Sequence, residues 1–379
     1  MAGTVRKRNG SWQALLSFRD PATQKSKQLS VTKATKREAE TALAELLLRR
    51  DRDTFAADGR QKFSDVVAAW LCFKERTSEP ATMLRYDSAL RIHLLPEFGN
   101  LRLNAITSAR IDAWYAAQTA RGLSDNSVRQ HHDLLSNILR YAVRTLKWIT
   151  SNPVTDSNPP RRSATSVTLP TPDRLIALIE AADDDGALFG TFVRMAICTG
   201  ARRGELCALQ WKHIDLEHGR VSVNGSIARG KDGCYLKLPK SRRTRTIAIP
   251  SVMAEHLSVY RSYRADLAEK FGGAIDGECS LFDCDPAGRR LGNPGTMSEK
   301  YKIAKRVAGI KEVRLHDLRH HAATVLLNNR VSPRVVAERL GHTRVSTTLD
   351  IYAQFVDLAD AEAAEIMGGF LPGGVVAMP

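Results

Sequence analysis

Cysteine is scarce in this sequence of 379 residues, and its six cysteines form no recognisable set. No two of them are spaced as Cys-x-x-Cys, so neither a zinc knuckle nor a disulfide framework is predicted. We therefore expect reduced and mostly buried thiols, as in cytosolic proteins, with Cys279 and Cys284 as candidates for the core.

Long apolar runs are missing as well. No uninterrupted hydrophobic stretch approaches the length of a membrane-spanning helix. The basic residues 1–10 are not followed by the apolar stretch of a secretory signal. These absences argue against a membrane partner and predict a protein of the cytoplasm.

Acidic side chains are outnumbered by basic ones, 41 against 56, which leaves a net charge of +15 at pH 7. The N-terminal, middle and C-terminal regions are each basic, so a polyanionic partner is expected to run along the whole chain. Nucleic acid fits this better than an anionic membrane, because no basic helix carries a clear apolar underside.

One short stretch, Leu-His-Asp-Leu-Arg-His-His at residues 315–321, concentrates groups that suit a phosphate under attack. On a helix, His316 and Arg319 share one face because they are three residues apart. The guanidinium can hold two phosphate oxygens, and the imidazole can move a proton near neutral pH. Downstream, His342 adds a donor and Tyr352 a phenolic oxygen that can act as a nucleophile.

The same region has two other interpretations. His316 and His320 have the spacing of two zinc ligands on a helix, with Asp317 where such sites usually carry Glu. A zinc hydrolase would need a third ligand, and none is evident. Residues 335–346 also fit a helix-turn-helix motif, which favours a DNA-binding regulator without catalytic activity.

A second motif, Thr-Gly-Ala-Arg-Arg-Gly-Glu-Leu, occupies residues 199–206. It follows a helix predicted at 189–199, which is apolar nearly throughout and is therefore expected to be buried. The glycine can end this helix. Arg202 and Glu205 then lie one turn apart. A regulator would give Arg202 no role.

Strands and further helices are predicted beyond this motif. The patterns indicate strands at 220–223, 235–238 and 244–249, with Lys240 between the last two. Residues 251–311 are predicted to be helical, with an irregular interruption from 272 to 293.

The N-terminal half divides by pattern into a small sheet, a set of helices and a linker. Residues 3–31 indicate three antiparallel strands with Asn9-Gly10 as the first hairpin turn, and a helix is predicted at 35–51. Residues 62–150 have helical spacing of apolar side chains. Residues 151–166, rich in Pro, Asn, Ser and Arg, have the composition of a linker.

Taken in order, these motifs resemble the tyrosine recombinase (phage integrase) family, closely in the C-terminal half and by organisation in the N-terminal half. The resemblance implies an α+β multidomain fold. It combines a three-stranded sheet plus helix, a helical core-binding domain and a mainly helical catalytic domain with a small antiparallel sheet. The implied domains are 1–60 (arm-type DNA-binding), 61–150 (helical core-binding, SAM-like), 151–167 (linker), 168–360 (catalytic) and 361–379 (C-terminal tail).

The resemblance also implies how the site would act. Arg202 and Arg319 would neutralise the oxygens of the attacked phosphate while Tyr352 attacks phosphorus and forms a 3′-phosphotyrosine. Because that bond stores the energy for rejoining, no ATP, metal or other cofactor is expected.

The remaining site residues would move protons and bind DNA. His316 is the expected general base. Lys240, at the tip of a hairpin that the strands at 235–238 and 244–249 would flank, is the expected general acid for the leaving oxygen. His342 would hold a phosphate oxygen, and Glu205 would orient groups in the site. The residues expected to contact DNA elsewhere are Arg6, Lys7, Arg8, Lys237, Arg242 and Arg243.

The function implied is site-specific integration or excision of a phage or mobile element. The expected partners are double-stranded attachment-site DNA, further copies of the chain in a tetramer, and an excisionase or DNA-bending protein. The expected location is the cytoplasm of a bacterial host, at the nucleoid. A helix-turn-helix regulator and a type IB-like topoisomerase, which shares the chemistry, are the alternatives.

Overall fold

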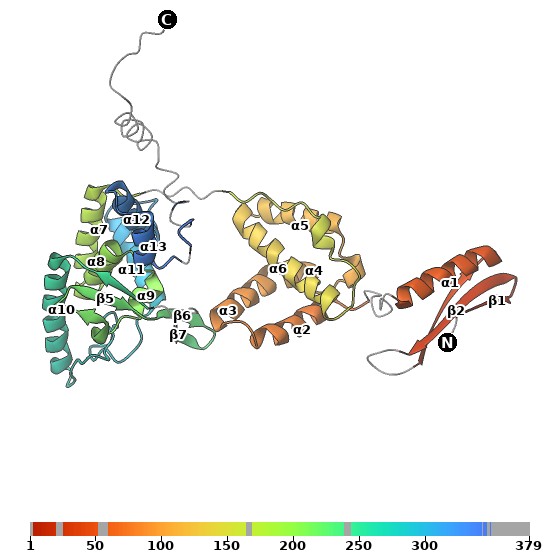
Figure 1. The fold of residues 1–379 in the computed structure, drawn as a ribbon, viewed down its shortest axis with the longest axis horizontal. Helices are drawn as coiled ribbons and strands as arrows, with labels where there is room; N and C mark the ends of the chain where they lie inside the picture. Colours follow the sequence, from red (N-terminus) through yellow and green to blue (C-terminus); the bar gives the residue numbers. More distant parts are fainter. Residues whose placement is uncertain are drawn as a thin grey trace, which may run out of the picture. The chain divides into compact units, whose positions relative to one another are not determined.

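The computed structural model describes residues 3–19, 26–51, 60–163, 169–238, 244–342, 344–346 and 349. The chain forms two compact units, residues 1–164 and 165–379 (Figure 1). No described helix is long and apolar enough to cross a membrane.

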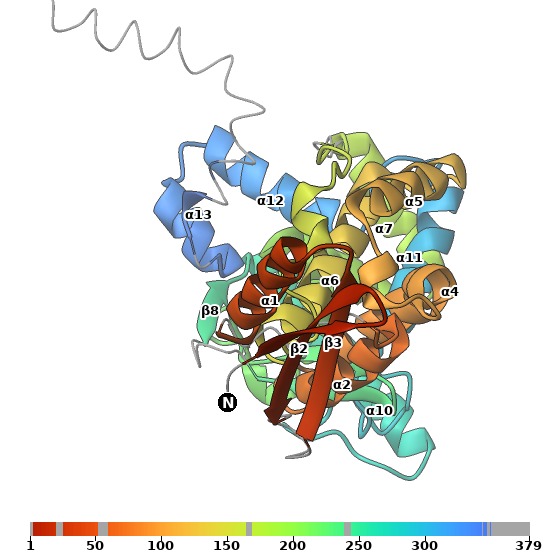
Figure 2. The ribbon, with the colours of Figure 1, turned by 90° about the vertical axis from the view of Figure 1, so that its right-hand side faces the viewer.

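A three-stranded antiparallel sheet and one helix open the first unit, as predicted. The elements are β1 (Thr4–Arg8), β2 (Ser11–Arg19), β3 (Ser26–Lys33) and α1 (Lys36–Asp51), in the strand order β1-β2-β3 (Figure 2). Asn9 and Gly10 form the first turn with φ angles of 47° and 80°, the left-handed pair that a tight hairpin needs. Ala14, Ala39 and Ala42 form a small buried cluster where α1 packs on the sheet.

The other face of this sheet is polar and open. Side chains alternate along a strand, so Val5 and Trp12 pack with the helix side, whereas Arg6 and Arg8 project from the opposite face. Arg6 lies across from Gln13 and donates hydrogen bonds to its side chain at 3.2 and 3.3 Å. The sequence pattern therefore produces a sheet with one small apolar face and one face of hydroxyls, amides and arginines.

The rest of the first unit is helical, again as predicted. Its elements are α2 (Phe63–Glu75), α3 (Pro80–Ala89), η2 (Leu90–Leu94, a π-helical turn), α4 (Leu95–Phe98), η3 (Leu103–Ala105), α5 (Ser108–Ala120), α6 (Asp125–Arg144) and η4 (Pro153–Asp156). Thr107 and Ser124 cap α5 and α6 through their side-chain oxygens, which satisfies amides that a helix start leaves unpaired. Phe63 and Trp70 are buried in the core that these helices share.

The first part of the predicted linker is attached to these helices. Val154 is buried on η4, and the Asn152 amide donates to the carbonyl of Ser136 at 3.2 Å. Farther along, the backbone N–H of Asn158 donates to Asp112 at 2.7 Å. A composition typical of a linker therefore belongs here to a segment that is tied to the helical surface by side-chain hydrogen bonds.

The second unit combines helices with two small antiparallel sheets. Its elements are α7 (Pro172–Asp184), α8 (Ala187–Thr199), α9 (Arg203–Cys207), η5 (Trp211–His213), β4 (Ile214–Asp215), β5 (Arg220–Val223), β6 (Ser226–Gly230), β7 (Gly233–Lys237), β8 (Arg245–Ala248), α10 (Ser251–Lys270), α11 (Pro294–Val307), α12 (Asp317–Asn328) and α13 (Pro333–Leu340). The buried helix α8 runs through the core, and Phe189, Phe192 and Val193 on it are almost fully covered.

The strand pairing differs from the prediction. Strands at 235–238 and 244–249 were expected to flank one hairpin tip, but in the described residues β7 pairs with β6, and β8 pairs with β5. The sheets have the orders β4-β5-β8 and β6-β7. β6 itself was not predicted, because Ser-Ile-Ala-Arg-Gly has little strand-like alternation.

The irregular interruption after α10 packs against the core. Leu281 and Phe282 are fully buried, and the buried Arg264 guanidinium donates to the carbonyls of Asp283 and Asp285 at 2.8 and 2.9 Å. Cys279 is buried as expected, but the prediction for Cys284 is wrong because that residue is exposed. The Asp283 carboxylate accepts backbone hydrogen bonds that turn the chain at this point.

Several predicted site residues lie outside the described residues. They are Lys240, Arg242, Arg243 and Tyr352, together with the C-terminal tail 361–379.

Candidate functional site

The site begins where the buried helix α8 ends. Gly200 takes a left-handed conformation with φ of 62° and ends the helix, as glycine commonly does. The Thr199 hydroxyl accepts a hydrogen bond from the Ala201 N–H at 3.1 Å. This local turn delivers Arg202 directly before α9, so the Thr-Gly pair of the motif sets the direction of the chain.

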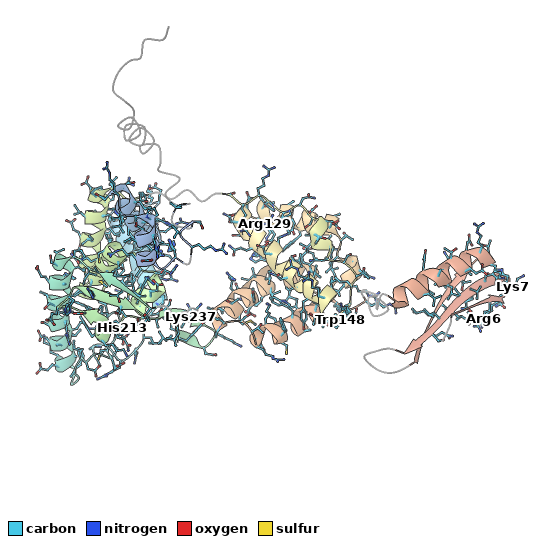
Figure 3. The ribbon with its side chains drawn as sticks, in the orientation of Figure 1. Arg6, Lys7, Arg129, Trp148, His213 and Lys237 are labelled. Atoms are coloured by element: carbon cyan, nitrogen blue, oxygen red, sulfur yellow. The ribbon has the colours of Figure 1, made fainter. Side chains whose placement is uncertain are left out.

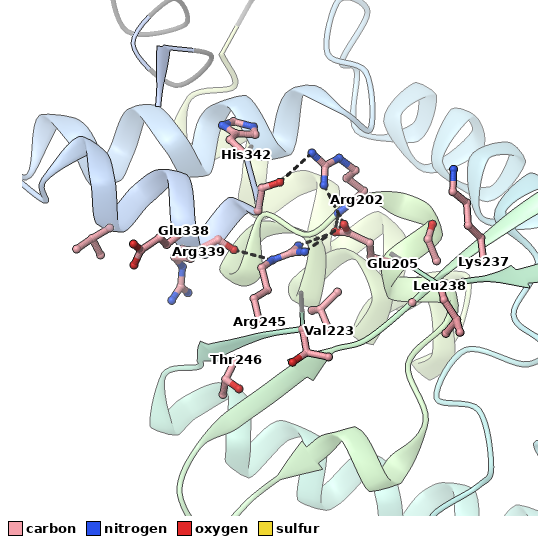
Figure 4. Close-up of a pocket in the computed structure, with 15 residues that line it drawn as sticks. Arg202, Glu205, Val223, Lys237, Leu238, Arg245, Thr246, Glu338, Arg339 and His342 are labelled. Carbon is pink, nitrogen blue, oxygen red and sulfur yellow. Dashed lines mark hydrogen bonds and ion pairs between the residues drawn. The ribbon is translucent and has the colours of Figure 1, made fainter. Parts of the chain in front are cut away.

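Arg202, Glu205 and Arg245 form a compact ionic cluster (Figure 4). Glu205 accepts from the Arg202 guanidinium at 2.9 Å and from the Arg202 backbone N–H at 2.8 Å. It also accepts two hydrogen bonds from Arg245, at 2.6 and 3.2 Å. One carboxylate therefore joins two arginines that come from different elements.

Glu205 stays ionised because its carboxylate is paired with Arg202 and Arg245. Its side chain is only 10% exposed, and burial by itself raises the pKa of a carboxyl group. The hydrogen bond and charge of Arg245, with those of Arg202, outweigh burial and hold the pKa of Glu205 below its ordinary value. The cluster is therefore charged and cationic overall at neutral pH.

Arg319 reaches the same region from α12. The helix start is fixed by the buried Asp317, which accepts from the backbone N–H of Arg314 at 2.8 Å. Arg319, 4% exposed, donates to the carbonyls of Gly200 at 2.8 Å and Leu340 at 2.7 Å. Burial, followed by the charge of Arg202, lowers the pKa of Arg319 to about 9, so its guanidinium remains charged at pH 7.

The carbonyls at the end of α13 accept hydrogen bonds from Arg202, Arg245 and Arg319. Gly341 is left-handed, and the N–H groups of Gly341 and His342 donate back to Glu338 and Ala337, the Schellman arrangement of a helix end. The carbonyls of Arg339, Leu340 and Gly341 each accept a hydrogen bond from one of the three arginines. His342 is thereby held next to Arg202, whose guanidinium lies 3.4 Å from the Gly341 carbonyl.

The histidines of the site are neutral at neutral pH. His316 precedes α12, with its ring 4.9 Å from that of His320 in an edge-to-face pair. Loss of hydration, then His320 and the Arg319 charge, lower the pKa of His316. Burial, then Arg319 and Arg202, lower the pKa of His342 to about 4.

A cavity of about 830 Å³ opens over this cluster. Arg202, Glu205, Arg245 and His342 line it, together with Lys237 from β7 (Figure 4). Its lining carries three arginines and a lysine against two carboxylates, Glu205 and Glu338, so its net charge is positive and favours an anion. A phosphate held there would meet fixed donors on several sides.

The structure brings four of the predicted residues to this cavity, namely Arg202, Glu205, Lys237 and His342. Arg319 and His316 do not line it, but both lie close enough to the site arginines for their charges to interact. In the N-terminal sheet, Arg6 and Lys7 lie on β1 (Figure 3). Lys7 is directed to the helix side, with its ammonium 5.9 Å from the centre of the Trp12 ring.

Sequence reasoning missed Arg245. A signal was present, because Arg245 has the same strand parity as the buried Ile247, and a charged residue at an inward position needs a partner. The zinc interpretation gains nothing, since no group of three or more His, Cys, Asp or Glu side chains within the described part of the chain could hold a metal ion.

Comparisons with known proteins agree with this arrangement. The profile of the phage integrase family matches residues 171–357, and that of the phage integrase N-terminal SAM-like domain matches residues 62–117. The ICEBs1 integrase of Bacillus subtilis (strain 168) is 24% identical over 365 residues, which cover 96% of this chain and 98% of that protein.

Solved structures share the fold. The Tn1549 transposon integrase in complex with transposon right end DNA superposes with a TM-score of 0.65 at 19% identity, covering 81% of this chain and 100% of that one. A lambda integrase tetramer bound to a Holliday junction gives a TM-score of 0.58 at 20% identity, with 91% and 94% covered. The chain belongs to the phage integrase family of tyrosine recombinases, and it is a site-specific recombinase that transfers DNA strands.

Proposed function

We propose that this recombinase cuts and rejoins double-stranded DNA at the attachment sites of a phage or mobile element, with Tyr352 as the nucleophile. One observation carries the proposal. Arg202 and Arg319 come from distant segments of the chain, yet both donate to consecutive carbonyls at the end of α13, beside His342. Paired arginines aimed at one place suit a phosphodiester that gains charge in the transition state.

The proposed reaction needs two proton transfers. The Tyr352 oxygen attacks phosphorus while His316 takes the phenolic proton, and the bond from phosphorus to the 5′ oxygen breaks. Lys240 protonates that leaving oxygen, which gives a 3′-phosphotyrosine and a free 5′-hydroxyl. Attack by a 5′-hydroxyl of another strand reverses the steps and joins the new partners.

The charges around the histidines support this division of roles. A general base must be unprotonated, and the lowered pKa of His316 keeps its imidazole neutral at pH 7. A neutral His342 can donate a hydrogen bond to a phosphate oxygen without adding charge. The arginines supply the positive charge, since they stay protonated throughout the physiological range.

The proposed domains are those of the sequence prediction: 1–60 for arm-type DNA binding, 61–150 for core-site binding, 151–167 as linker, 168–360 for catalysis and 361–379 as tail. The polar open face of the β1-β2-β3 sheet, with Arg6 and Arg8, is the proposed DNA-contacting face of the first domain. Lys237, Arg242 and Arg243 are proposed phosphate contacts.

We infer that the working assembly is a tetramer on DNA in the cytoplasm of a bacterial host, at the nucleoid. Similar integrases have been seen with transposon end DNA and as a tetramer on a Holliday junction. An excisionase or DNA-bending protein is proposed as a further partner, which would set the direction of the reaction.

A trapping experiment tests the proposal. The full-length protein is incubated, with EDTA present, with a nicked suicide duplex that carries the junction between the element and its host DNA. The wild type is expected to form a covalent protein–DNA adduct, and Tyr352→Phe is expected to form none. Tyr263→Phe, which changes a partly exposed tyrosine on α10, serves as the matched control and should behave as wild type.

The other outcomes separate the alternatives. Specific binding without any adduct would favour the helix-turn-helix regulator, and an adduct that survives Tyr352→Phe would mean that another residue is the nucleophile. Two intact duplexes that both carry the junction distinguish recombination from topoisomerase activity, because only a recombinase should exchange both strands between them.

A further inference from the structure

The carbonyl groups at the end of α13 are all engaged, and three of them accept from arginines. The Arg339 carbonyl accepts from Arg245 at 2.9 Å, the Leu340 carbonyl from Arg319 at 2.7 Å, and the Gly341 carbonyl from Arg202 at 3.4 Å. A helix leaves its last carbonyls unpaired and carries partial negative charge there. Three guanidinium groups from three different segments therefore converge on one helix end.

Of these three arginines, Arg245 alone has no role in the proposed chemistry. Its side chain is 17% exposed, and its donors are directed into the protein, toward Glu205 and the Arg339 carbonyl. The turn at Gly341, which follows α13, also lies against the Arg245 side chain. A Cβ atom on Gly341 would lie 2.8 Å from Nη1 and 3.0 Å from Cζ of Arg245, so a larger residue there would displace the Arg245 guanidinium and would also be strained at the φ of 70°.

Arg202 depends on this arrangement for its position. Its side chain is 45% exposed, and a long, exposed arginine loses considerable conformational entropy when it is held in one rotamer. Glu205 holds it, and Arg245 holds Glu205 with a two-point contact of fixed geometry. Without Arg245, the Glu205 carboxylate would keep only its hydrogen bonds with Arg202, and the two side chains could move together.

We propose that Arg245 is a positioning residue of the recombinase, which acts through Glu205 on Arg202 and through the Arg339 carbonyl on the turn that carries His342. The inference rests on the proposed function, since it takes Arg202 and His342 as phosphate-binding groups. Arg245 would not touch the DNA. Its effect would be felt in the rate of strand cleavage and much less in DNA affinity.

The test separates these two quantities in the full-length protein. The rate of first-strand cleavage at saturating DNA and the Kd are measured on the junction suicide duplex for wild type, Arg245→Gln and Arg245→Lys. For Arg245→Gln we expect the cleavage rate to fall by about 10²-fold, the effect of a misplacement on the order of 1 Å. The Kd should change by less than about 3-fold, because no contact with DNA is lost.

The cleavage rates of Glu205→Gln and of the double variant Arg245→Gln/Glu205→Gln complete a double-mutant cycle. If Arg245 acts through Glu205, most of its effect should vanish once Glu205 is changed. Arg220→Gln is the matched control, because Arg220 is an exposed arginine on the neighbouring strand β5, and it should leave the rate unchanged. Arg245→Lys keeps the charge but not the two-point contact, so it should remain slow.

Three results would overturn the inference. They are cleavage by Arg245→Gln within about 2-fold of wild type, rate losses that multiply fully in the double variant, and a rise in Kd as large as the fall in rate. If Arg245→Gln does not fold, as judged by circular dichroism, Arg245→Lys decides in its place. Failure of the proposed function is distinguishable, because the wild type itself would then form no Tyr352-dependent adduct.

Discussion

At the scale of single residues, the protonation state of the histidines follows from their burial and from the arginines around them. Burial is the largest cause that lowers the pKa of His342 to about 4 and that also lowers the pKa of His316, and each positive guanidinium nearby adds to this by disfavouring a further positive charge. A bound phosphodiester would bring a negative charge and oppose this effect. DNA binding should therefore raise both pKa values back toward 6.5, the ordinary value for histidine.

This gives a prediction for the pH dependence of cleavage. Below saturation with DNA, the rate reports the free enzyme, and we expect it to stay constant from pH 8 to about 5.5, falling only as pH approaches about 4, where the base gains a proton. At saturating DNA the fall should begin at higher pH, as the pKa of the base is raised. Single-turnover cleavage at both DNA concentrations, with folding checked at each pH, provides the measurement.

An acid limb centred near 6.5 below saturation would contradict this account, because it would mean that burial and the neighbouring arginines do not lower the pKa of the histidine base in the free enzyme. His316→Asn should remove the acid limb along with most of the rate, if His316 is the base.

The residues of the site differ in how visible they are in the sequence. Arg202, Glu205, His316, Arg319 and His342 lie in short motifs whose chemistry can be inferred from residue type and spacing. Arg245 stands alone on a strand, and its partners are 40 and 94 residues away. A contact of that kind depends on tertiary packing, which local pattern does not encode.

At the scale of elements, helix ends account for most of the site. Gly200 ends α8 and faces α12 and α13, since a Cβ atom on it would lie 2.5 Å from Leu340 and 3.2 Å from Ala322. The two helix ends are also joined by the Arg339 guanidinium, which donates to the Cys198 carbonyl at 2.8 Å. The ends of α8 and α13 thus form one packed unit.

Gly200→Ala is therefore expected to lower the stability of this unit by more than the cost of placing alanine in a left-handed conformation. Alanine in that conformation costs about 1 kcal/mol, and the overlap with Leu340 should add about 1–3 kcal/mol. Gly272→Ala is the matched control, because Gly272 follows α10 with a similar φ of 72° and has no atoms near its Cβ position.

Thermal unfolding of the two variants gives the comparison. We expect a clearly lower Tm for Gly200→Ala than for Gly272→Ala, and slower strand cleavage only in the former. Equal Tm values would show that α13 can move aside without cost, and would weaken the argument for a tightly fitted site.

Secondary-structure elements were easier to predict from the sequence than the pairing of strands. The Asn9-Gly10 turn depends on neighbouring residues, and its prediction is confirmed. Strand pairing depends on distant segments, so β7 and β8 were wrongly expected to flank one hairpin. A period of two identifies a strand but does not say which strand lies beside it.

At the scale of the whole molecule, the charge of +15 is distributed over regions with different geometry. Only charges that face DNA release counterions when it binds, so the salt dependence of affinity counts phosphate contacts. In the N-terminal sheet, Arg6 and Arg8 share the open face, whereas Lys7 faces the helix side over Trp12.

We expect the open face to account for the salt dependence in this region. The double variant Arg6→Ala/Arg8→Ala should reduce the slope of log K against log salt by about 2, roughly one for each lost phosphate contact. Lys7→Ala, on the same strand, is the control and should change the slope little. Affinities of the full-length proteins for a long junction duplex, measured across a range of salt concentrations, give the slopes.

A larger change for Lys7→Ala than for the double variant would place the DNA on the other side of the sheet. Equal small changes would mean that this sheet does not bind DNA backbone under those conditions.

The row of carbonyls at the end of α13 has a consequence for how this protein can vary in length. Each residue added to or removed from a helix rotates everything beyond it by about 100°. An insertion of one residue between Pro333 and Leu340 would therefore turn the carbonyls away from all three arginines at once. The tight β6–β7 turn, whose Gly233 has open space around it, faces no such restriction. Relatives that keep this site should differ in length at that hairpin and hardly ever within α13.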